Sequence, residues 1–204
     1  KKNIILFLTS DDNVNDKVFD PKLKGEYDNY KSLLIYHYKL LKISNKIVCQ
    51  NTYQKEQISK FFPEKNNIIL KCPVEVEEYK NISLDEKIYD FIWIGKIDRV
   101  KGFDCIIELL KLFPHCKFAI FSSSMNLEYD ELDFSFIDNE NLNFFKYANS
   151  DFVCKTIKKS KFLINTSLFE GFPNTFLEAL KFEVPLISLN VNPDNLFDFN
   201  LGFF

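Results

Sequence analysis

Apolar residues recur along the chain in two alternating patterns, short continuous runs and stripes with helical spacing. The short runs predict buried strands, because a strand covered on both faces is apolar throughout. They span residues 3–8, 46–50, 67–70, 89–94, 117–121, 143–145, 162–164 and 185–189. Apolar positions three or four residues apart predict amphipathic helices. These helices span residues 26–41, 53–62, 103–112 and 152–159, with another opening near Pro173.

Strands that alternate with helices at these spacings indicate an α/β fold with a doubly wound, Rossmann-like parallel sheet. A charged stretch, residues 75–87, interrupts the alternation and predicts a linker between residues 1–74 and residues 88–204. Residues 122–140 are polar and acidic, which predicts an irregular surface excursion.

Residues 170–178 (EGFPNTFLE) predict a loop that leads into a helix. Pro173 suits the first helical position, where its missing N–H costs nothing. The helix would turn one apolar stripe to the core, formed by Pro173, Phe176, Leu177 and Leu180. Glu178 falls nearly opposite this stripe, and Glu170 lies in the loop. Taken alone, both would be ordinary solvated glutamates, but they flank a helix N-terminus that favours an anion.

Two loops that lead into a helix follow directly after predicted buried strands. Residues 95–102 (GKIDRVKG) come after the run at 89–94, and residues 170–174 come after the run at 162–164. In doubly wound sheets ligands bind beyond the carboxyl ends of the strands. We therefore expect the two segments to meet at one crevice.

Composition narrows the class of protein. The 204-residue chain is 46% hydrophobic, enough for one or two domains, and its net charge of −3 with no basic run gives no indication of nucleic-acid binding. The five cysteines are scattered without a Cys-x-x-Cys pair, which favours a reduced, cytoplasmic chain over a disulfide framework or zinc site. No apolar stretch is long enough for a transmembrane segment. Since the chain begins at Lys1 and its single methionine is Met125, we expect a piece of a larger protein.

The phrase at 170–178 resembles the signature of retaining, nucleotide-sugar-dependent glycosyltransferases of the GT-B fold, the group 1 family. Residues 179–188 and the segment 95–102 continue that pattern in the expected order. The resemblance extends from about Lys46 onward. It implies that residues 88–204 are a C-terminally incomplete donor-binding domain and that residues 1–74 are the end of the N-terminal acceptor domain.

The resemblance also implies roles for the two glutamates and their neighbours. Glu170 would be the catalytic carboxylate, beside the donor sugar's hydroxyls and its anomeric carbon. Glu178 would accept hydrogen bonds from the ribose hydroxyls, which a carboxylate can do with both oxygens. Gly171 and Phe172 would contact the sugar through their backbone.

The diphosphate would be held without a metal. The N–H groups of Asn174 and Thr175, with a lysine, would stabilise the negative charge that grows on the leaving group. The residues of the upstream loop that would form the clamp are Gly95, Lys96, Lys101 and Gly102. No Asp-x-Asp occurs in the sequence, so we expect no metal and no cofactor besides the nucleotide-sugar donor, a UDP or GDP sugar.

The chain departs from the family pattern in places. The backbone near Tyr147 and Ala148 would touch the base, although the family usually has a glycine there. Residues 122–124 (SSS) replace a glycine-rich turn, and Lys96 stands where arginine is common. Most of the acceptor domain, with its glycine-rich loop and histidine, has no counterpart. We therefore expect this chain alone to bind donor without transferring sugar.

Other functions remain open on the same fold. One is a nucleotide-sugar epimerase or phosphorylase, and another is a non-catalytic nucleotide-binding module. For a transferase, the acceptor would be a carbohydrate or a lipid-linked molecule bound through the missing N-terminal region. The full-length protein could then be peripheral to a membrane.

Overall fold

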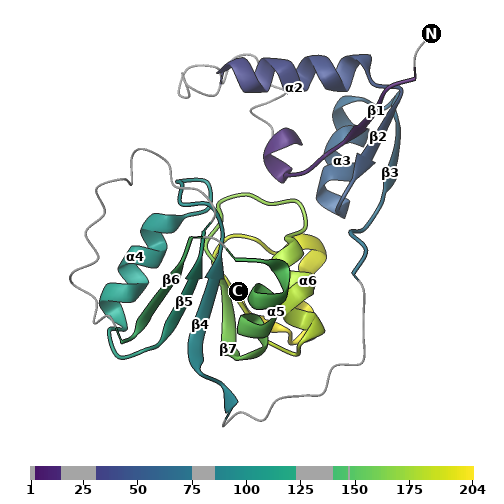
Figure 1. Cartoon of the computed structure of the whole chain (residues 1–204). Helices are drawn as coiled ribbons and strands as arrows, with labels where there is room; N and C mark the ends of the chain where they lie inside the picture. Colours follow the sequence, from purple (N-terminus) through teal and green to yellow (C-terminus); the bar gives the residue numbers. More distant parts are fainter. Residues whose placement is uncertain (1–2, 15–30, 75–85, 123–139, 147) are drawn as a thin grey trace. The chain divides into compact units, whose positions relative to one another are not determined.

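The computed structural model describes residues 3–14, 31–74, 86–122, 140–146 and 148–204, without the side chains of residues 31–35 (Figure 1). The chain divides into two compact units. The first comprises Lys1–Pro73 together with Phe169–Phe172, and the second comprises Val74–Leu168 together with Pro173–Phe204. Most of the expected linker, residues 75–85, lies outside the described residues.

The first unit contains a three-stranded parallel sheet in the order β1-β2-β3. Its strands are β1 (Ile5–Phe7), β2 (Lys46–Cys49) and β3 (Asn66–Ile69), and its helices are η1 (Asp11–Val14), α2 (Lys31–Ile43) and α3 (Thr52–Phe61). The middle strand β2 is the most deeply buried, because it has a neighbour on each edge. The residues buried around it are Leu8, Val14, Leu41, Ile47, Cys49, Ile58 and Phe62.

Helix α3 begins one residue earlier than its sequence suggests. The apolar spacing predicts a helix over residues 53–62, but α3 begins at Thr52. Its N-cap is Asn51, whose Oδ1 accepts a hydrogen bond from the N–H of Gln54 at 2.8 Å. Asn51 has extended backbone angles, which suit an N-cap, whereas Thr52 already has its place in the first turn.

The described residues of the second unit form a six-stranded parallel sheet in the order β6-β5-β4-β7-β8-β9. Its strands are β4 (Tyr89–Ile94), β5 (Phe118–Phe121), β6 (Leu142–Phe145), β7 (Ser160–Asn165), β8 (Leu186–Ser188) and β9 (Gly202–Phe203). Its helices are α4 (Phe103–Leu112), α5 (Ser150–Lys158), α6 (Asn174–Lys181) and η5 (Pro193–Phe199). The strand order reverses between β4 and β7, as in the Rossmann fold, which confirms the predicted α/β class.

The helices cover both faces of this sheet, α4 on one face and α5 and α6 on the other (Figure 1). Right-handed crossovers require this arrangement, because the chain winds outward through β4, β5 and β6 and then returns to β7. Because all of these strands are parallel, their carboxyl ends share one edge of the sheet.

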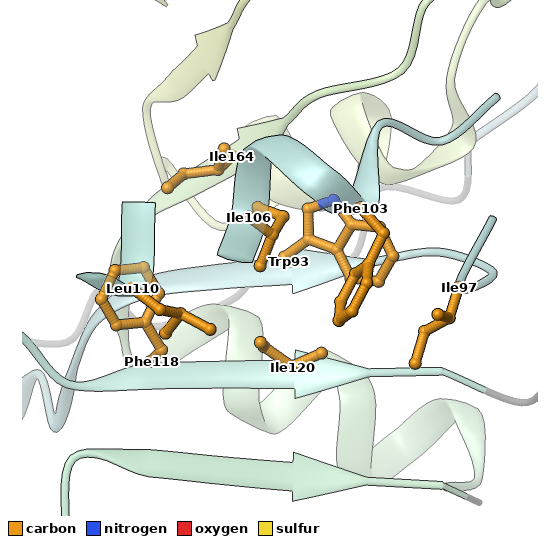
Figure 2. Packing of buried hydrophobic residues seen from close by; sticks show 8 residues of the cluster. All are labelled: Trp93, Ile97, Phe103, Ile106, Leu110, Phe118, Ile120 and Ile164. Atoms are coloured by element: carbon orange, nitrogen blue, oxygen red, sulfur yellow. The ribbon is translucent and has the colours of Figure 1, made fainter. Parts of the chain in front are cut away.

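The core of the second unit lies between α4 and the sheet (Figure 2). The ring of Trp93 on β4 packs against that of Phe103, with the ring centroids 5.3 Å apart. The Trp93 Nε1–H donates to Thr166 Oγ1 at 3.0 Å, so the indole is buried with its polar atom satisfied. The other residues of the cluster are Ile97, Ile106, Leu110, Phe118, Ile120 and Ile164. This contact fixes the end of β4 against the segment that follows β7.

Helix α6 differs from its predicted form in two respects. It begins at Asn174, with Pro173 as the N-cap instead of the first helical residue. Phe176 and Ala179 are the helix residues that are buried, whereas Leu177 and Leu180 of the expected stripe are partly exposed. The buried side of the helix is thus formed by Phe176 and Ala179 instead of by the full predicted stripe.

Candidate functional site

A pocket of about 330 Å³ opens at the carboxyl ends of β4, β5 and β6 in the second unit. Its described lining residues are Ile94, Gly95, Lys96, Lys101, Phe121, Ser122, Phe145, Lys146, Ala148 and Val153. The pocket thus brings together three of the residues predicted for the diphosphate clamp, Gly95, Lys96 and Lys101, and also includes Ala148, which was expected beside the base. Lys146 on the β6 side was not among the predicted site residues.

Aromatic rings form one wall of this pocket. Phe121 at the end of β5 stacks on Phe145 at the end of β6, with centroids 4.6 Å apart and planes 22° apart. Phe152 meets both rings edge-on, at 5.8 and 5.2 Å. Such geometry is favourable for aromatic pairs and holds the rings in place.

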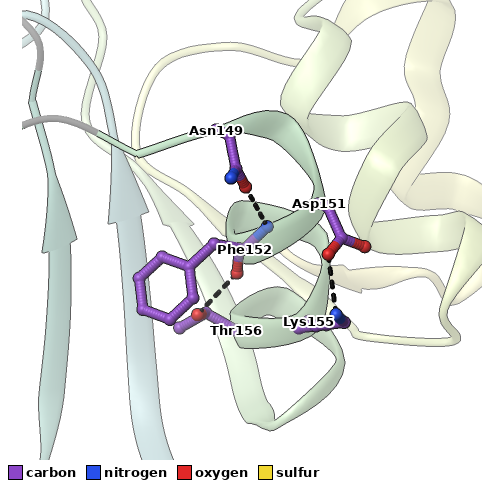
Figure 3. A network of polar contacts seen from close by, with 5 residues as sticks. All are labelled: Asn149, Asp151, Phe152, Lys155 and Thr156. Carbon is purple, nitrogen blue, oxygen red and sulfur yellow. Dashed lines mark hydrogen bonds and ion pairs between the residues drawn. The ribbon is translucent and has the colours of Figure 1, made fainter.

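The first turn of α5 holds Phe152 against these two rings (Figure 3). Asn149 is the N-cap, and its Oδ1 accepts a hydrogen bond from the Phe152 N–H at 2.8 Å. The Phe152 carbonyl in turn accepts from Thr156 Oγ1 at 2.8 Å, and Lys155 pairs with Asp151 at 2.6 Å. The aromatic wall therefore rests on a well-capped helix.

Gly102, one of the residues predicted to form the diphosphate clamp, is buried and is not among the described residues that line the pocket. Its φ of 64° is left-handed, and an added Cβ would lie 2.1 Å from the carbonyl oxygen of Thr166. Glycine is required here by packing against the segment after β7.

The loop that carries Lys96 and Lys101 is anchored from two directions. The Lys101 N–H donates to Asp98 Oδ1 at 2.8 Å, and the Lys101 carbonyl accepts from Thr166 Oγ1 at 2.7 Å. The Leu168 N–H donates to the Val100 carbonyl at 2.8 Å. The segments after β4 and β7 are thus in direct contact, at the point where the strand order reverses. Lys96 is exposed and Lys101 is half-buried.

Helix α6 carries three predicted site residues, Asn174, Thr175 and Glu178, none of which is among the described residues that line the pocket. The N-cap Pro173 provides no side-chain hydrogen bond to the first turn. Glu178 is half-buried, and burial raises the pKa of its carboxyl, an effect that the charge of Lys181 opposes. After burial, the charge of Glu178 is the next cause that raises the pKa of the Cys154 thiol on α5. Glu178 is therefore less solvated than the sequence suggested, and its charge influences the titration of a residue on α5.

The segment Phe169–Phe172 belongs to the first unit. The Glu170 carbonyl accepts a hydrogen bond from the Asp11 N–H at 3.1 Å, and the Gly171 carbonyl accepts from Asn51 Nδ2 at 2.8 Å. The Phe172 N–H donates to Gln50 Oε1 at 3.3 Å. The predicted catalytic and sugar-contacting residues are thus held by residues that sequence analysis did not single out.

Asp11 is the most perturbed acid of this group. Burial raises its pKa to about 6, although hydrogen bonds from Asn51 and Gln54 oppose the rise. The charge of Glu170 adds a smaller contribution in the same direction as burial. No sequence motif marked Asp11, because its partners lie far away along the chain.

The remaining predictions concern the base and metals. Tyr147 lies outside the described residues, although Ala148 beside it lines the pocket. Within the part of the chain that the structure describes, no group of three or more His, Cys, Asp or Glu side chains is placed to hold a metal ion. None of the described helices is both long and apolar enough to cross a membrane.

Comparison with known proteins identifies the family. Residues 75–194, more than half of the chain, match the family described as glycosyl transferases group 1. The chain therefore belongs to the group 1 glycosyltransferases, as the motifs at 95–102 and 170–178 indicated.

Individual relatives agree with this assignment. An uncharacterised glycosyltransferase of Methanocaldococcus jannaschii is 29% identical over 163 residues, which are 78% of this chain and 37% of that protein. Staphylococcus aureus TarM, solved as a mutant with fondaparinux, α-GlcNAc-glycerol and UDP, superimposes with a TM-score of 0.66 at 15% identity, covering 94% of this chain and 38% of TarM. The pneumococcal O-GlcNAc transferase GtfA, solved with UDP and GlcNAc, superimposes with a TM-score of 0.65 at 17% identity, covering 95% of this chain and 38% of GtfA.

A sucrose-phosphate synthase of Thermosynechococcus elongatus gives a TM-score of 0.67 at 12% identity, covering 90% of this chain and 49% of that one. At these identities the likeness shows a shared GT-B fold with Rossmann-like sheets. The chain spans less than half the length of each of these relatives.

Proposed function

We propose that this chain binds a nucleotide-sugar donor, a UDP or GDP sugar, and that the whole protein uses it for retaining, metal-independent glycosyl transfer. The observation that carries the proposal is the pocket at the carboxyl ends of β4, β5 and β6, in a chain that belongs to the group 1 family. The acceptor would be a carbohydrate or a lipid-linked molecule.

The chemistry of the pocket fits a nucleoside diphosphate. The stacked rings of Phe121 and Phe145 offer an apolar wall for a flat base. Lys96 and Lys101 follow β4, one strand away from Phe121 and two strands away from Phe145, and supply positive charge for a diphosphate. Because neighbouring strands lie about 4.8 Å apart, β4 and β6 are separated by roughly 10 Å, a span suited to a nucleotide laid across the edge.

The carboxylates would serve the two sugars of the donor. Glu178 would accept the ribose hydroxyls, and a half-buried carboxylate gains from such donors because it has lost part of its hydration. Glu170 would sit beside the transferred sugar and stabilise the positive charge that develops at the anomeric carbon. Gly171 and Phe172 would contact that sugar through their backbone.

Bond cleavage leaves negative charge on the diphosphate. The free N–H groups of the first turn of α6, at Asn174 and Thr175, would stabilise it together with Lys96 and Lys101. Positive charge supplied in this way needs no divalent cation.

Titration of the purified chain with UDP, GDP and ADP, and with UDP-glucose and GDP-mannose, tests the proposal by thermal shift and calorimetry. A ligand that binds the folded state alone raises stability by about 2.7 kcal/mol at 100 times its Kd. At least one diphosphate should raise the melting temperature, and its affinity should be the same in EDTA. If none of the nucleotides binds, the donor-site proposal fails. If EDTA abolishes binding, the metal-independent part fails.

A further inference from the structure

The first unit contains a cluster of polar side chains buried behind the segment that carries Glu170. Asn51 is 1% exposed and Gln54 is 0% exposed, both in or beside the first turn of α3. Buried amides cost free energy unless they are hydrogen-bonded. Their partners therefore show what the two side chains are there to hold.

The side chain of Asn51 takes part in three hydrogen bonds, each with a different partner. Its Oδ1 accepts from the Gln54 N–H at 2.8 Å and so caps α3. Its Nδ2 donates to Asp11 Oδ1 at 2.8 Å and to the Gly171 carbonyl at 2.8 Å. Capping needs the oxygen alone, so the two bonds of the nitrogen serve another purpose.

Gln54 supports Asn51 from the same helix. Its Oε1 accepts from the Gln50 N–H at 2.7 Å, and its Nε2 donates to Asp11 Oδ1 at 3.0 Å. One carboxylate oxygen of Asp11 is therefore shared by two buried amides. The Asp11 N–H completes the arrangement by donating to the Glu170 carbonyl at 3.1 Å.

The fit against Gly171 is close. A Cβ added to Gly171 would lie 1.9 Å from Gln50 Oε1 and 2.8 Å from Gln54 Nε2. The backbone carbonyls of residues 170 and 171 both accept hydrogen bonds from this cluster. Two successive peptide groups are thus fixed, and they set the direction in which the Glu170 side chain leaves the backbone.

We infer that Asn51, supported by Asp11 and Gln54, is a positioning residue that sets the Glu170–Gly171 backbone for binding the sugar half of the donor. The inference rests on the proposed function, because it takes Glu170 and Gly171 to contact the transferred sugar.

The test separates the sugar from the nucleotide. For wild type, calorimetry gives the affinities for UDP and UDP-glucose, or for GDP and GDP-mannose if that pair binds, and their ratio reports the contribution of the sugar. Asn51→Ser keeps an N-cap oxygen but loses both Nδ2 bonds. Asn45→Ser is the matched control. It makes the same substitution at another asparagine of the first unit, whose Oδ1 accepts a hydrogen bond from the Ile4 N–H at 2.9 Å, outside the cluster of Asn51, Gln54 and Asp11.

We expect Asn51→Ser to reduce the sugar contribution about 3- to 10-fold, the range for one buried hydrogen bond, with the affinity for the diphosphate unchanged. Asn45→Ser should leave both values unchanged. Asp11→Ala removes the shared acceptor and a buried charge, so it should reduce the sugar contribution as Asn51→Ser does. It replaces Asn51→Ser in the test if Asn51→Ser does not fold.

Each outcome has a distinct meaning. If neither diphosphate nor nucleotide sugar binds to wild type, the proposed function fails. If both bind and Glu170→Ala reduces the sugar contribution while Asn51→Ser and Asp11→Ala do not, the donor site stands and the positioning role is wrong. An equal loss of affinity for both ligands in Asn51→Ser would also refute it, because that result indicates a merely structural residue.

Discussion

The raised pKa of Asp11 predicts that the stability of the folded chain depends on pH. Burial destabilises the charged carboxylate, so the pKa of Asp11 is about 6 in the folded chain, whereas an aspartate in an unfolded chain has a pKa of 3.8. Between these values the folded state holds more protons than the unfolded state. The free energy of unfolding must therefore fall as pH rises from about 4 to about 6.

The substitution Asp11→Asn should remove this pH-dependent loss of unfolding free energy. Asparagine cannot ionise, but its Oδ1 can still accept the hydrogen bonds of Asn51 and Gln54. A difference of about two pKa units corresponds to roughly 3 kcal/mol at 1.36 kcal/mol per unit. Because Asp11 keeps some contact with solvent, we discount this to about 1–2 kcal/mol.

Urea unfolding of both proteins at pH 4, 5, 6 and 7.5 measures the effect. The variant should equal wild type near pH 4 and be more stable by about 1–2 kcal/mol at pH 7.5. Asp12→Asn is the control for loss of one negative charge from η1, since Asp12 does not share the bonds of Asn51 and Gln54. A difference that does not change with pH, or a less stable variant at pH 7.5, would refute the assignment of the cost to a buried charge.

Three further predictions concern the second unit. Glu178→Ala should weaken nucleoside diphosphate binding by ~1–3 kcal/mol in calorimetry, and unchanged affinity would remove the ribose role. Lys101→Ala should weaken the diphosphate by ~1.5–3 kcal/mol, less at high salt, but not the bare nucleoside; an equal loss for both would mean that Lys101 shapes the pocket. Gly102→Ala should destabilise the fold by at least about 2 kcal/mol in urea unfolding, since a left-handed residue would collide with Thr166; wild-type stability would contradict the packing argument.

The sequence by itself determined the class of fold and much of the second unit. The sequence segments that form β4, β5 and β7 are apolar because these strands are buried within a parallel sheet. Such apolar segments can be recognised from the local sequence. The loop at 95–102 could be placed for the same reason, since it directly follows β4. The two-residue strand β9 and the kinked η5 were missed, because neither has a periodic apolar pattern.

The tertiary structure alone decided what lies around Glu170. Asn51 reaches Asp11 across 40 positions and Gly171 across 120 positions, and no local pattern encodes such pairs. The same holds for Gly102, whose need for glycine comes from Thr166 on the segment after β7. Periodicity records which face of an element is buried, whereas the partner of a buried polar atom depends on how distant segments are brought together in the fold.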